Sequence, residues 1–235
     1  MLFRIILSSL AFNLVIAQEK IQYNVMELLG KANPEFYNEK IPMIKEAGEA
    51  FVNMQKEAIK EGIKIEIVSG FRSYNRQKQI WNRKFRINKM NGLSPQQNLL
   101  KIIEYSTLPG TSRHHWGTDI DIIDGNKTVS GDLLLEGNFH GDGPYVKLRK
   151  WMDINAKRFG FYRPYNNNPK RKGFEYEPWH YSYAPIAIPM LKAYIKLKLR
   201  DQIIQKDLEG YQYLNNNFIV KYKKEHILGI SNNLK

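Results

Sequence analysis

The sequence contains no cysteine. This absence excludes a disulfide framework and any metal site built from thiolates. A zinc ion in this chain would have to be held by histidine nitrogen and carboxylate oxygen alone. Without disulfides the fold must be stabilised by its core, and 235 residues are enough to bury a sizeable one. The lack of cysteine also argues against a lipoprotein anchor.

Acidic residues are few relative to basic ones. The chain has 23 Asp and Glu against 36 Lys and Arg, a formal net charge of +13. Such a balance favours anionic surroundings, which include nucleic acid, anionic lipid and acidic polymers. We find no nucleic-acid recognition motif, and we therefore expect no nucleic-acid partner. A hydrophobic content of 43% argues against disorder.

Long apolar runs are missing except at the N-terminus. Residues 1–17 read MLFRIILSSLAFNLVIA, with a single base at Arg4, a mostly apolar run and a polar stretch from Gln18. This pattern predicts a secretory signal peptide cleaved near Ala17, because the run is too short for a comfortable membrane span. We expect an exported protein, periplasmic or extracellular, with no stable span after cleavage. An uncleaved anchor is the alternative.

The remaining chain shows no internal repeat and no low-complexity linker. Strands and helices are expected to interleave irregularly, for example a helix from Ile41 to Gly62 followed by a strand over 63–67. This order predicts one α+β domain over residues 18–205. Residues 206–235 are expected to form a basic helical extension in which His226 is solvated. Residues 163–173 are expected to form a basic loop.

The stretch 109–124, PGTSRHHWGTDIDIID, concentrates the polar chemistry of the chain. Residues 118–122 alternate polar and apolar side chains, which is typical of a half-buried strand with Asp119 and Asp121 on one face. Two carboxylates side by side repel unless a cation or a base lies between them. Neighbours on an extended chain point apart, so we do not expect His115 to share a site with His114. The alternative for Asp119 and Asp121 is that they lie on an ordinary strand face exposed to solvent.

A catalytic zinc site takes three protein ligands and leaves a fourth position for water. His114 lies on the loop that feeds the strand of Asp121, which gives one nitrogen and one oxygen. The segment Glu177-Pro178-Trp179-His180 adds an imidazole and a carboxylate three residues apart. A carboxylate placed in this way can serve as general base towards water.

These blocks resemble the VanY-like D-alanyl-D-alanine carboxypeptidase family of zinc peptidases. The resemblance rests on Ser-x-His-x-x-Gly-x-x-x-Asp, the later Glu-x-Trp-His and an upstream Ser-Gly-Phe-Arg-Ser-Tyr block, in the family's order over roughly residues 63–184. It implies one zinc ion per chain. It also implies a fold of the hedgehog and DD-peptidase group, a small antiparallel sheet flanked by helices. By position it implies metal ligands at His114, Asp121 and His180, a catalytic base at Glu177, substrate carboxylate or oxyanion binding by Arg72, and substrate-site positions at Gln77 and Ser112.

The function implied is an exported zinc peptidase that cleaves peptidoglycan stem peptides. A D-Ala-D-Ala carboxypeptidase using zinc-activated water and a glutamate base is the leading hypothesis. The alternatives are an L,D-carboxypeptidase, a peptidoglycan endopeptidase, or a non-catalytic relative that binds cell wall or zinc. An intact Glu177 argues against the last, because binding alone does not need a base.

One departure from the family pattern concerns Asp119. The family usually has a small residue there, often Ala, whereas this chain places a second carboxylate two residues before Asp121. We expect Asp119 to lie near the metal without binding it, and we expect Asp119→Ala to keep both metal and activity. A smaller departure is Phe71, which replaces a tyrosine.

Overall fold

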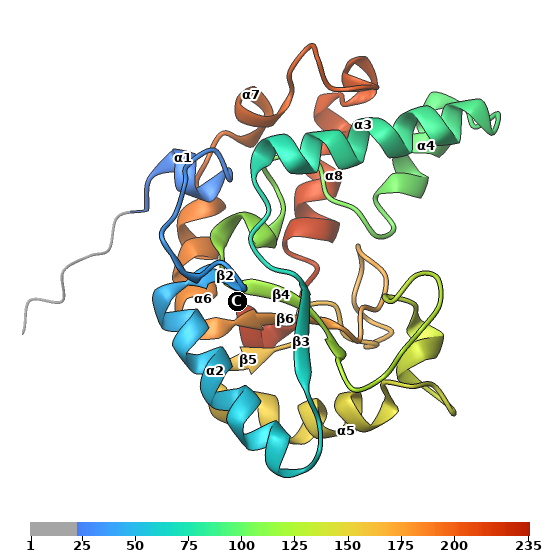
Figure 1. Cartoon of the computed structure of the whole chain (residues 1–235). Coiled ribbons are helices and arrows are strands. Elements are labelled where there is room, and N and C mark those ends of the chain that lie inside the picture. Colours follow the sequence, from blue (N-terminus) through green and yellow to red (C-terminus); the bar gives the residue numbers. More distant parts are fainter. Residues whose placement is uncertain (1–22) are drawn as a thin grey trace, which may run out of the picture.

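The computed structural model describes residues 23–235 (Figure 1). The predicted signal peptide and its cleavage site lie outside the described residues. Within the described part, no helix combines the length and the apolar character that crossing a membrane requires.

A four-stranded antiparallel sheet forms the centre of the molecule (Figure 1). Its spatial order is β3 (Ile65–Ser69), β4 (Asp119–Asp124), β6 (His180–Tyr183) and β5 (Phe161–Tyr162). A separate hairpin pairs β1 (Phe36–Asn38) with β2 (Ile41–Ile44). The small antiparallel sheet flanked by helices confirms the fold class predicted from the sequence.

Helices cover the sheet and complete the chain. The α-helices are α1 (Val25–Leu28), α2 (Lys45–Lys60), α3 (Tyr74–Met90), α4 (Pro95–Ile102), α5 (Val146–Asn155), α6 (Ala184–Tyr194), α7 (Leu199–Ile203) and α8 (Asn216–Tyr222). Short 3-10 turns include η1 (Arg113–Trp116), η2 (Glu136–Phe139), η3 (Ala156–Phe159), η4 (Tyr211–Tyr213) and η6 (Asn232–Leu234), and η5 (Lys223–Ile227) is a π-helical turn.

Two apolar clusters build the core. In the first, α2 and α5 pack on the sheet and bury Phe51, Leu148 and Ile120. In the second, α3, α4, α6 and α8 pack together and bury Trp81 and Tyr222. Figure 1 shows α2 and α5 below the sheet and α3, α4 and α8 above it. The loop before β4 contributes to the second cluster and β4 itself to the first, so β4 begins where the clusters meet.

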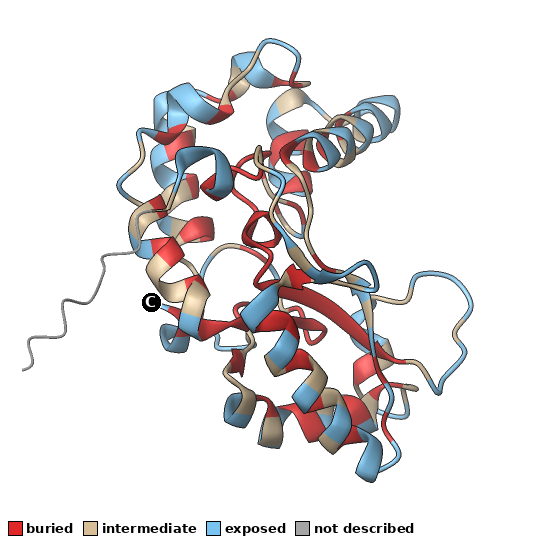
Figure 2. Cartoon of the chain, turned by 60° about the vertical axis from the view of Figure 1, so that its left-hand side comes forward, coloured by how far each residue is buried: buried red, intermediate tan, exposed pale blue. Residues whose placement is uncertain are grey.

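The strand β4 is more deeply buried than its alternating sequence predicts. All six of its residues are buried, and Figure 2 shows this strand in red along its length. Ile120 and Ile122 face the first cluster, as expected. The aspartates are also covered, because the opposite face meets η1 and a polar cavity rather than open solvent.

Two predictions from local pattern are wrong. The helix expected from Ile41 begins only at Lys45, because Ile41 and Ile44 pair with β1 and the backbone N–H of Ile44 donates to Gly117. His226, expected to be solvated, is only 8% exposed. Its ring stacks on Tyr222 at 4.9 Å between centroids and meets Phe174 edge-on. The segment expected as an extension packs into the second cluster through Leu208, Leu214, Ile219, Ile230 and Leu234.

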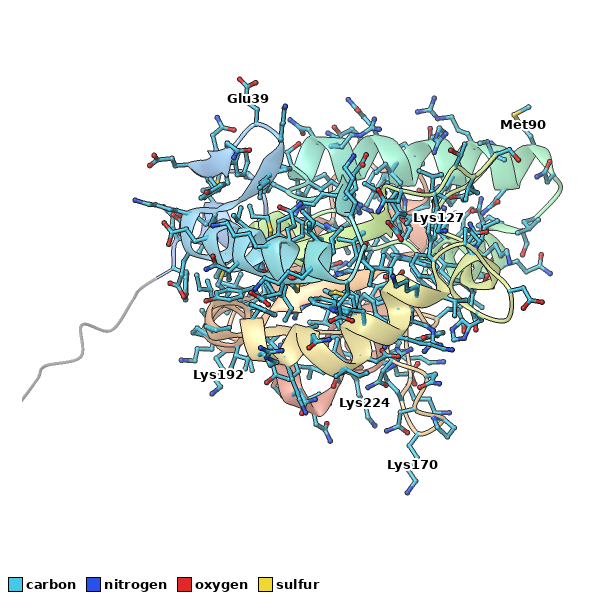
Figure 3. All side chains as sticks on the ribbon, turned by 60° about the horizontal axis from the view of Figure 1, so that its bottom comes forward. Glu39, Met90, Lys127, Lys170, Lys192 and Lys224 are labelled. Carbon is cyan, nitrogen blue, oxygen red and sulfur yellow. The ribbon has the colours of Figure 1, made fainter. Side chains whose placement is uncertain are left out.

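Several lysines of the chain project from the surface. Residues 163–173 form the expected loop without helix or strand. Figure 3 shows Lys170 of this loop, Lys192 of α6 and Lys224 pointing away from the body of the molecule.

Candidate metal centre and active site

The turn η1 places His114 beside the start of β4. It ends at Gly117, whose φ of 66° lies in the left-handed region that glycine adopts without strain. A side chain at Gly117 would approach the Cγ2 of Ile44 within 3.0 Å, so the chain needs glycine there for both conformation and space. The backbone N–H of Arg72 donates to the carbonyl of His114 over 3.0 Å, which ties η1 to the turn between β3 and α3.

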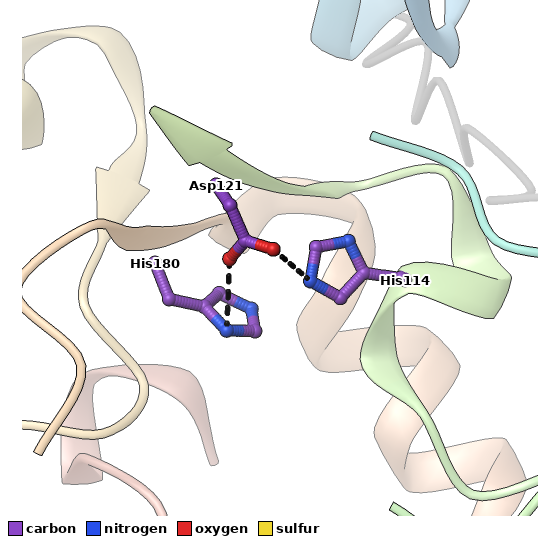
Figure 4. Close-up of side chains that lie close together, drawn as sticks. All are labelled: His114, Asp121 and His180. Carbon is purple, nitrogen blue, oxygen red and sulfur yellow. Dashed lines mark ion pairs between the residues drawn. The ribbon is translucent and has the colours of Figure 1, made fainter. Parts of the chain in front are cut away.

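Three predicted ligands come together on this frame. His180 stands opposite Asp121 in the pairing of β6 with β4. His114 Nε2 lies 3.3 Å from Asp121 Oδ2, and His180 Nδ1 lies 3.6 Å from Asp121 Oδ1 (Figure 4). One ligand atom from each residue falls within 4.8 Å of the others, and all three residues are buried.

The chemistry of these residues fits a zinc ion. Nitrogen, oxygen and nitrogen are zinc donors, and three of them leave a fourth position open. Among the described residues the buried Oδ1 of Asp121 has no hydrogen-bond donor, which suits an atom that binds a cation. The ring nitrogens that face away are both held: His114 Nδ1 donates to Gly70 O at 2.8 Å and His180 Nε2 donates to Asp119 Oδ2 at 2.9 Å. Such outer contacts orient metal ligands.

The electrostatics of the cluster also favour a cation. Burial raises the pKa of Asp121, but the nearby His114 and His180 rings and the Arg72 guanidinium outweigh it and hold this pKa at about 2. Burial lowers the pKa of His180, but its hydrogen bonds to Asp119 and Glu177 raise it to about 10. A proton on Nδ1 of His180 therefore balances the acids where a metal would otherwise bind, and proton and metal compete for this nitrogen.

Glu177 lies directly beside this cluster. Its Oε2 is 2.7 Å from His180 Nδ1, the nitrogen that faces Asp121, and the residue is only 7% exposed. The backbone N–H of Glu177 donates to Tyr165 O at 3.0 Å, which fixes the turn before β6. A carboxylate in this position can reach a water molecule at the metal centre.

Arg72 reaches the cluster from the turn after β3. Its Nη2 lies 3.6 Å from Asp121 Oδ2 and donates to Ser69 Oγ, and its Nη1 donates to Gln77 Oε1 at 3.1 Å. Gln77 is fully buried and donates in turn to Ser106 Oγ and Thr107 O. Gln77 therefore holds the guanidinium from behind and does not itself line the cavity.

A cavity of about 450 Å³ opens over the cluster. The three candidate ligands, Glu177, Arg72 and Ser112 all lie on its wall. Its wall also includes Ile80 and Lys84 of α3, together with Tyr105, Asp132 and Glu136. The wall of the cavity thus combines the buried polar cluster with side chains of both charge signs.

His115 has a different role from its neighbour. Its Nε2 accepts from the Gly110 N–H at 3.0 Å, so its Nδ1 donates to the Arg72 carbonyl. Burial lowers the pKa of this ring to about 3, which keeps it neutral. It braces the backbone of Arg72 and does not belong to the His114, Asp121 and His180 group. The expectation that it would not share the site assumed an extended chain, whereas residues 113–116 form a 3-10 turn.

Two side chains of this site, Arg113 and Ser182, were not predicted from the sequence. Arg113 Nε donates to Asp119 Oδ2 at 2.9 Å, and Ser182 Oγ donates to Asp119 Oδ1 at 2.7 Å. The only available signals were their positions, because Arg113 precedes His114 and Ser182 is two residues after His180, on the same face of β6.

A buried His-Asp-His cluster with an adjacent glutamate, set in a cavity on a small antiparallel sheet, is an arrangement that suits metal-assisted hydrolysis. Comparisons with known proteins give the family. The family model "VanY: D-alanyl-D-alanine carboxypeptidase" matches residues 40–186. The chain belongs to the VanY D-alanyl-D-alanine carboxypeptidase family.

Individual relatives agree with this assignment. The chain is 34% identical over 140 residues to the putative carboxypeptidase YodJ of Bacillus subtilis, covering 59% of this chain and 45% of that protein. It is 31% identical over 128 residues to a D-alanyl-D-alanine carboxypeptidase of Enterococcus faecalis, covering 54% of this chain and 42% of the relative. The matched regions thus span less than half the length of these two relatives.

The solved structure of VanYB in complex with D-alanine-D-alanine shares the fold. It superposes with a TM-score of 0.51 at 23% identity, covering 70% of this chain and 83% of that chain.

Proposed function

We propose that this protein is a zinc-dependent carboxypeptidase that removes the terminal D-alanine from peptidoglycan stem peptides. The observation that carries the proposal is the buried group of His114, Asp121 and His180, with Glu177 and Arg72 on the wall of the same cavity. Membership of the VanY family supports the substrate class.

The three buried residues would hold the metal. A zinc ion bound there would polarise the scissile carbonyl and acidify a water molecule. Glu177 then acts as the general base, since its Oε2 lies beside the metal-facing nitrogen of His180. It takes the proton of the attacking water and returns it to the leaving amine.

Arg72 selects the end of the peptide. A guanidinium can grip a carboxylate with two parallel hydrogen bonds, which a lysine cannot reproduce. Its contacts with Ser69 and Gln77 hold the group rigidly at the cavity wall. Arg72 would therefore bind the C-terminal carboxylate of the substrate and place the last peptide bond over the metal centre.

The test is digestion of a stem pentapeptide ending in D-Ala-D-Ala, read by mass spectrometry with and without a chelator. We expect loss of one alanine from the free acid, no reaction with the C-terminal amide, and no reaction after chelation. Equal cleavage of acid and amide would reject the carboxypeptidase and favour the endopeptidase. Cleavage of a tetrapeptide ending in a single D-Ala, with the pentapeptide left intact, would favour the L,D-carboxypeptidase.

We further propose that the protein acts outside the cytoplasm, after cleavage near Ala17. The support is the apolar pattern of residues 1–17 in the sequence. The mass of the N-terminal peptide of the mature protein tests this, and a retained Met1 would contradict it.

A further inference from the structure

Asp119 is the most completely enclosed acid of the site. It has no exposed surface, and its two oxygens accept hydrogen bonds from several donors. The donors are Arg113 Nε at 2.9 Å, His180 Nε2 at 2.9 Å, Ser182 Oγ at 2.7 Å and Thr118 Oγ1 at 2.8 Å. A carboxylate buried this deeply is retained only where its charge is paired and its lone pairs are used.

Arg113 supplies the matching charge. Its side chain is only 5% exposed, and its Nη2 donates to Ser182, which itself donates to Asp119. The pair therefore forms a hydrogen-bonded network with Ser182 between η1, β4 and β6. This network meets the candidate metal ligands through the hydrogen bond from His180 Nε2 to Asp119 Oδ2.

His180 has a carboxylate at each ring nitrogen, Glu177 at Nδ1 and Asp119 at Nε2. Once a metal takes the place of the proton on Nδ1, the contact with Asp119 holds the remaining proton on Nε2. An imidazole that binds a metal through one nitrogen carries its proton on the other. A hydrogen-bond acceptor at that other nitrogen therefore fixes which nitrogen binds the metal and how the ring is oriented. The acceptor at Nε2 is Asp119, which leaves Nδ1 towards Asp121. His114 is held the opposite way, since its Nδ1 donates to Gly70 and its Nε2 faces Asp121 (Figure 4).

We propose that Asp119 is a positioning residue that, together with Arg113, holds His180 with Nε2 protonated and Nδ1 directed at the metal. The inference rests on the metal site of the proposed function and assigns a role to the buried carboxylate two residues before Asp121. It replaces the expectation from sequence that Asp119→Ala is harmless, because alanine would leave Arg113 buried without its acid and His180 without its acceptor.

The first experiment measures zinc affinity by competition with a chromophoric chelator. We compare wild type, Asp119→Ala, Asp119→Asn and the control Asp124→Asn. Asp124 is a buried acid on the same strand whose carboxylate accepts from the backbone N–H of Lys64 and Asn126, so it matches the loss of a buried charge. Asp119→Ala should weaken zinc binding about 10- to 100-fold. Asp119→Asn keeps an acceptor for Nε2 and should recover most of it, and Asp124→Asn should bind zinc normally.

Zinc affinity of Asp119→Ala within about twofold of wild type would overturn the inference, as would equal weakening in Asp124→Asn. Failure of wild type to bind zinc would instead overturn the proposed metal site. A second measurement covers a variant that does not fold. In zinc-loaded wild type with 15N-labelled histidine, the His180 shifts should show a protonated Nε2 and a metal-bound Nδ1. A proton on Nδ1 would reject the role of Asp119 whatever the variants do.

Discussion

At the scale of single residues, the site is a balance of buried charge. Asp119, Asp121 and Glu177 all contact His180, and each is at most 7% exposed. So many acids are kept out of water only when cations compensate them. Arg113 compensates Asp119, whereas Asp121 lies beside Arg72 and the imidazoles of His114 and His180, where the proposed metal would bind. We therefore expect that metal binding requires His114, Asp121 and His180 together.

Removal of one ligand should empty the metal site. Two protein ligands hold zinc poorly, so His114→Ala, Asp121→Ala and His180→Ala should each lower the zinc content from about one ion per chain to near zero. Elemental analysis after dialysis against a weak chelator measures this. Full occupancy in His180→Ala would show that the metal is held elsewhere.

Loss of the general base should separate binding from catalysis. Glu177→Gln keeps the size of the side chain and its contact with His180 but cannot accept the proton of water. Turnover should fall at least about 10²-fold with zinc content unchanged. Paired measurements of zinc and peptide hydrolysis test this. Zinc lost together with activity would make Glu177 a ligand.

At the scale of elements, the sequence predicts what local chemistry decides. Ser73 predicts the start of α3, and its side chain does accept from the Arg76 N–H. The alternation of polar and apolar side chains around Asp121 likewise predicts β4 from local sequence alone. The strand over 41–44 could not be predicted in this way, because its pairing with β1 and its bond to Gly117 are tertiary.

The candidate site shows the same division. The order of the motifs predicts that His114, Asp121 and His180 come together. The structure places these three residues in one group. The order of the motifs could not predict that Asp119 pairs with Arg113 and Ser182. That network depends on the register of β4 against β6, which sets Asp119 opposite Ser182.

The C-terminal elements hold the loop before η1. The Tyr222 hydroxyl accepts from the Leu108 N–H at 3.1 Å and bonds Thr111 Oγ1 at 2.9 Å, and the Tyr194 hydroxyl donates to Gly110 O. Both tyrosines lie beyond the residues matched by the family model, which end at 186. The candidate site of this chain is thus supported from outside the family region.

Removing one hydroxyl should measure that support. Tyr222→Phe leaves the Leu108 N–H and the Thr111 hydroxyl buried with fewer partners, which should lower the free energy of unfolding by about 1–3 kcal/mol. Tyr211→Phe is the control, because Tyr211 is 36% exposed. Urea unfolding of both variants compares them. Equal stability of Tyr222→Phe and wild type would show that the loop is held by packing alone.

At the scale of the whole molecule, stability should depend on pH through buried histidine. His226 joins the C-terminal segment to the second cluster between Tyr222 and Phe174. Burial lowers its pKa to about 4, against which Glu225 acts, while Lys221 and Arg171 add to the lowering. The unfolded chain, with a histidine pKa of about 6.5, binds this proton first as pH falls.

The sign of the effect follows from that order of protonation. Between about pH 6.5 and 4 the unfolded state carries more protons, so the free energy of unfolding falls as pH falls. The contribution of His226 is complete above pH 6.5, and about 2 kcal/mol of it should be lost by pH 4.5. His226→Phe keeps an aromatic ring between Tyr222 and Phe174 without a proton site, so its stability should fall less over this range. His115, whose pKa is lowered to about 3, contributes in the same direction but equally to both proteins. Urea unfolding at several pH values, with chelator present throughout to remove metal linkage, measures the difference. Parallel pH curves for the two proteins would mean that His226 takes up its proton without leaving the core.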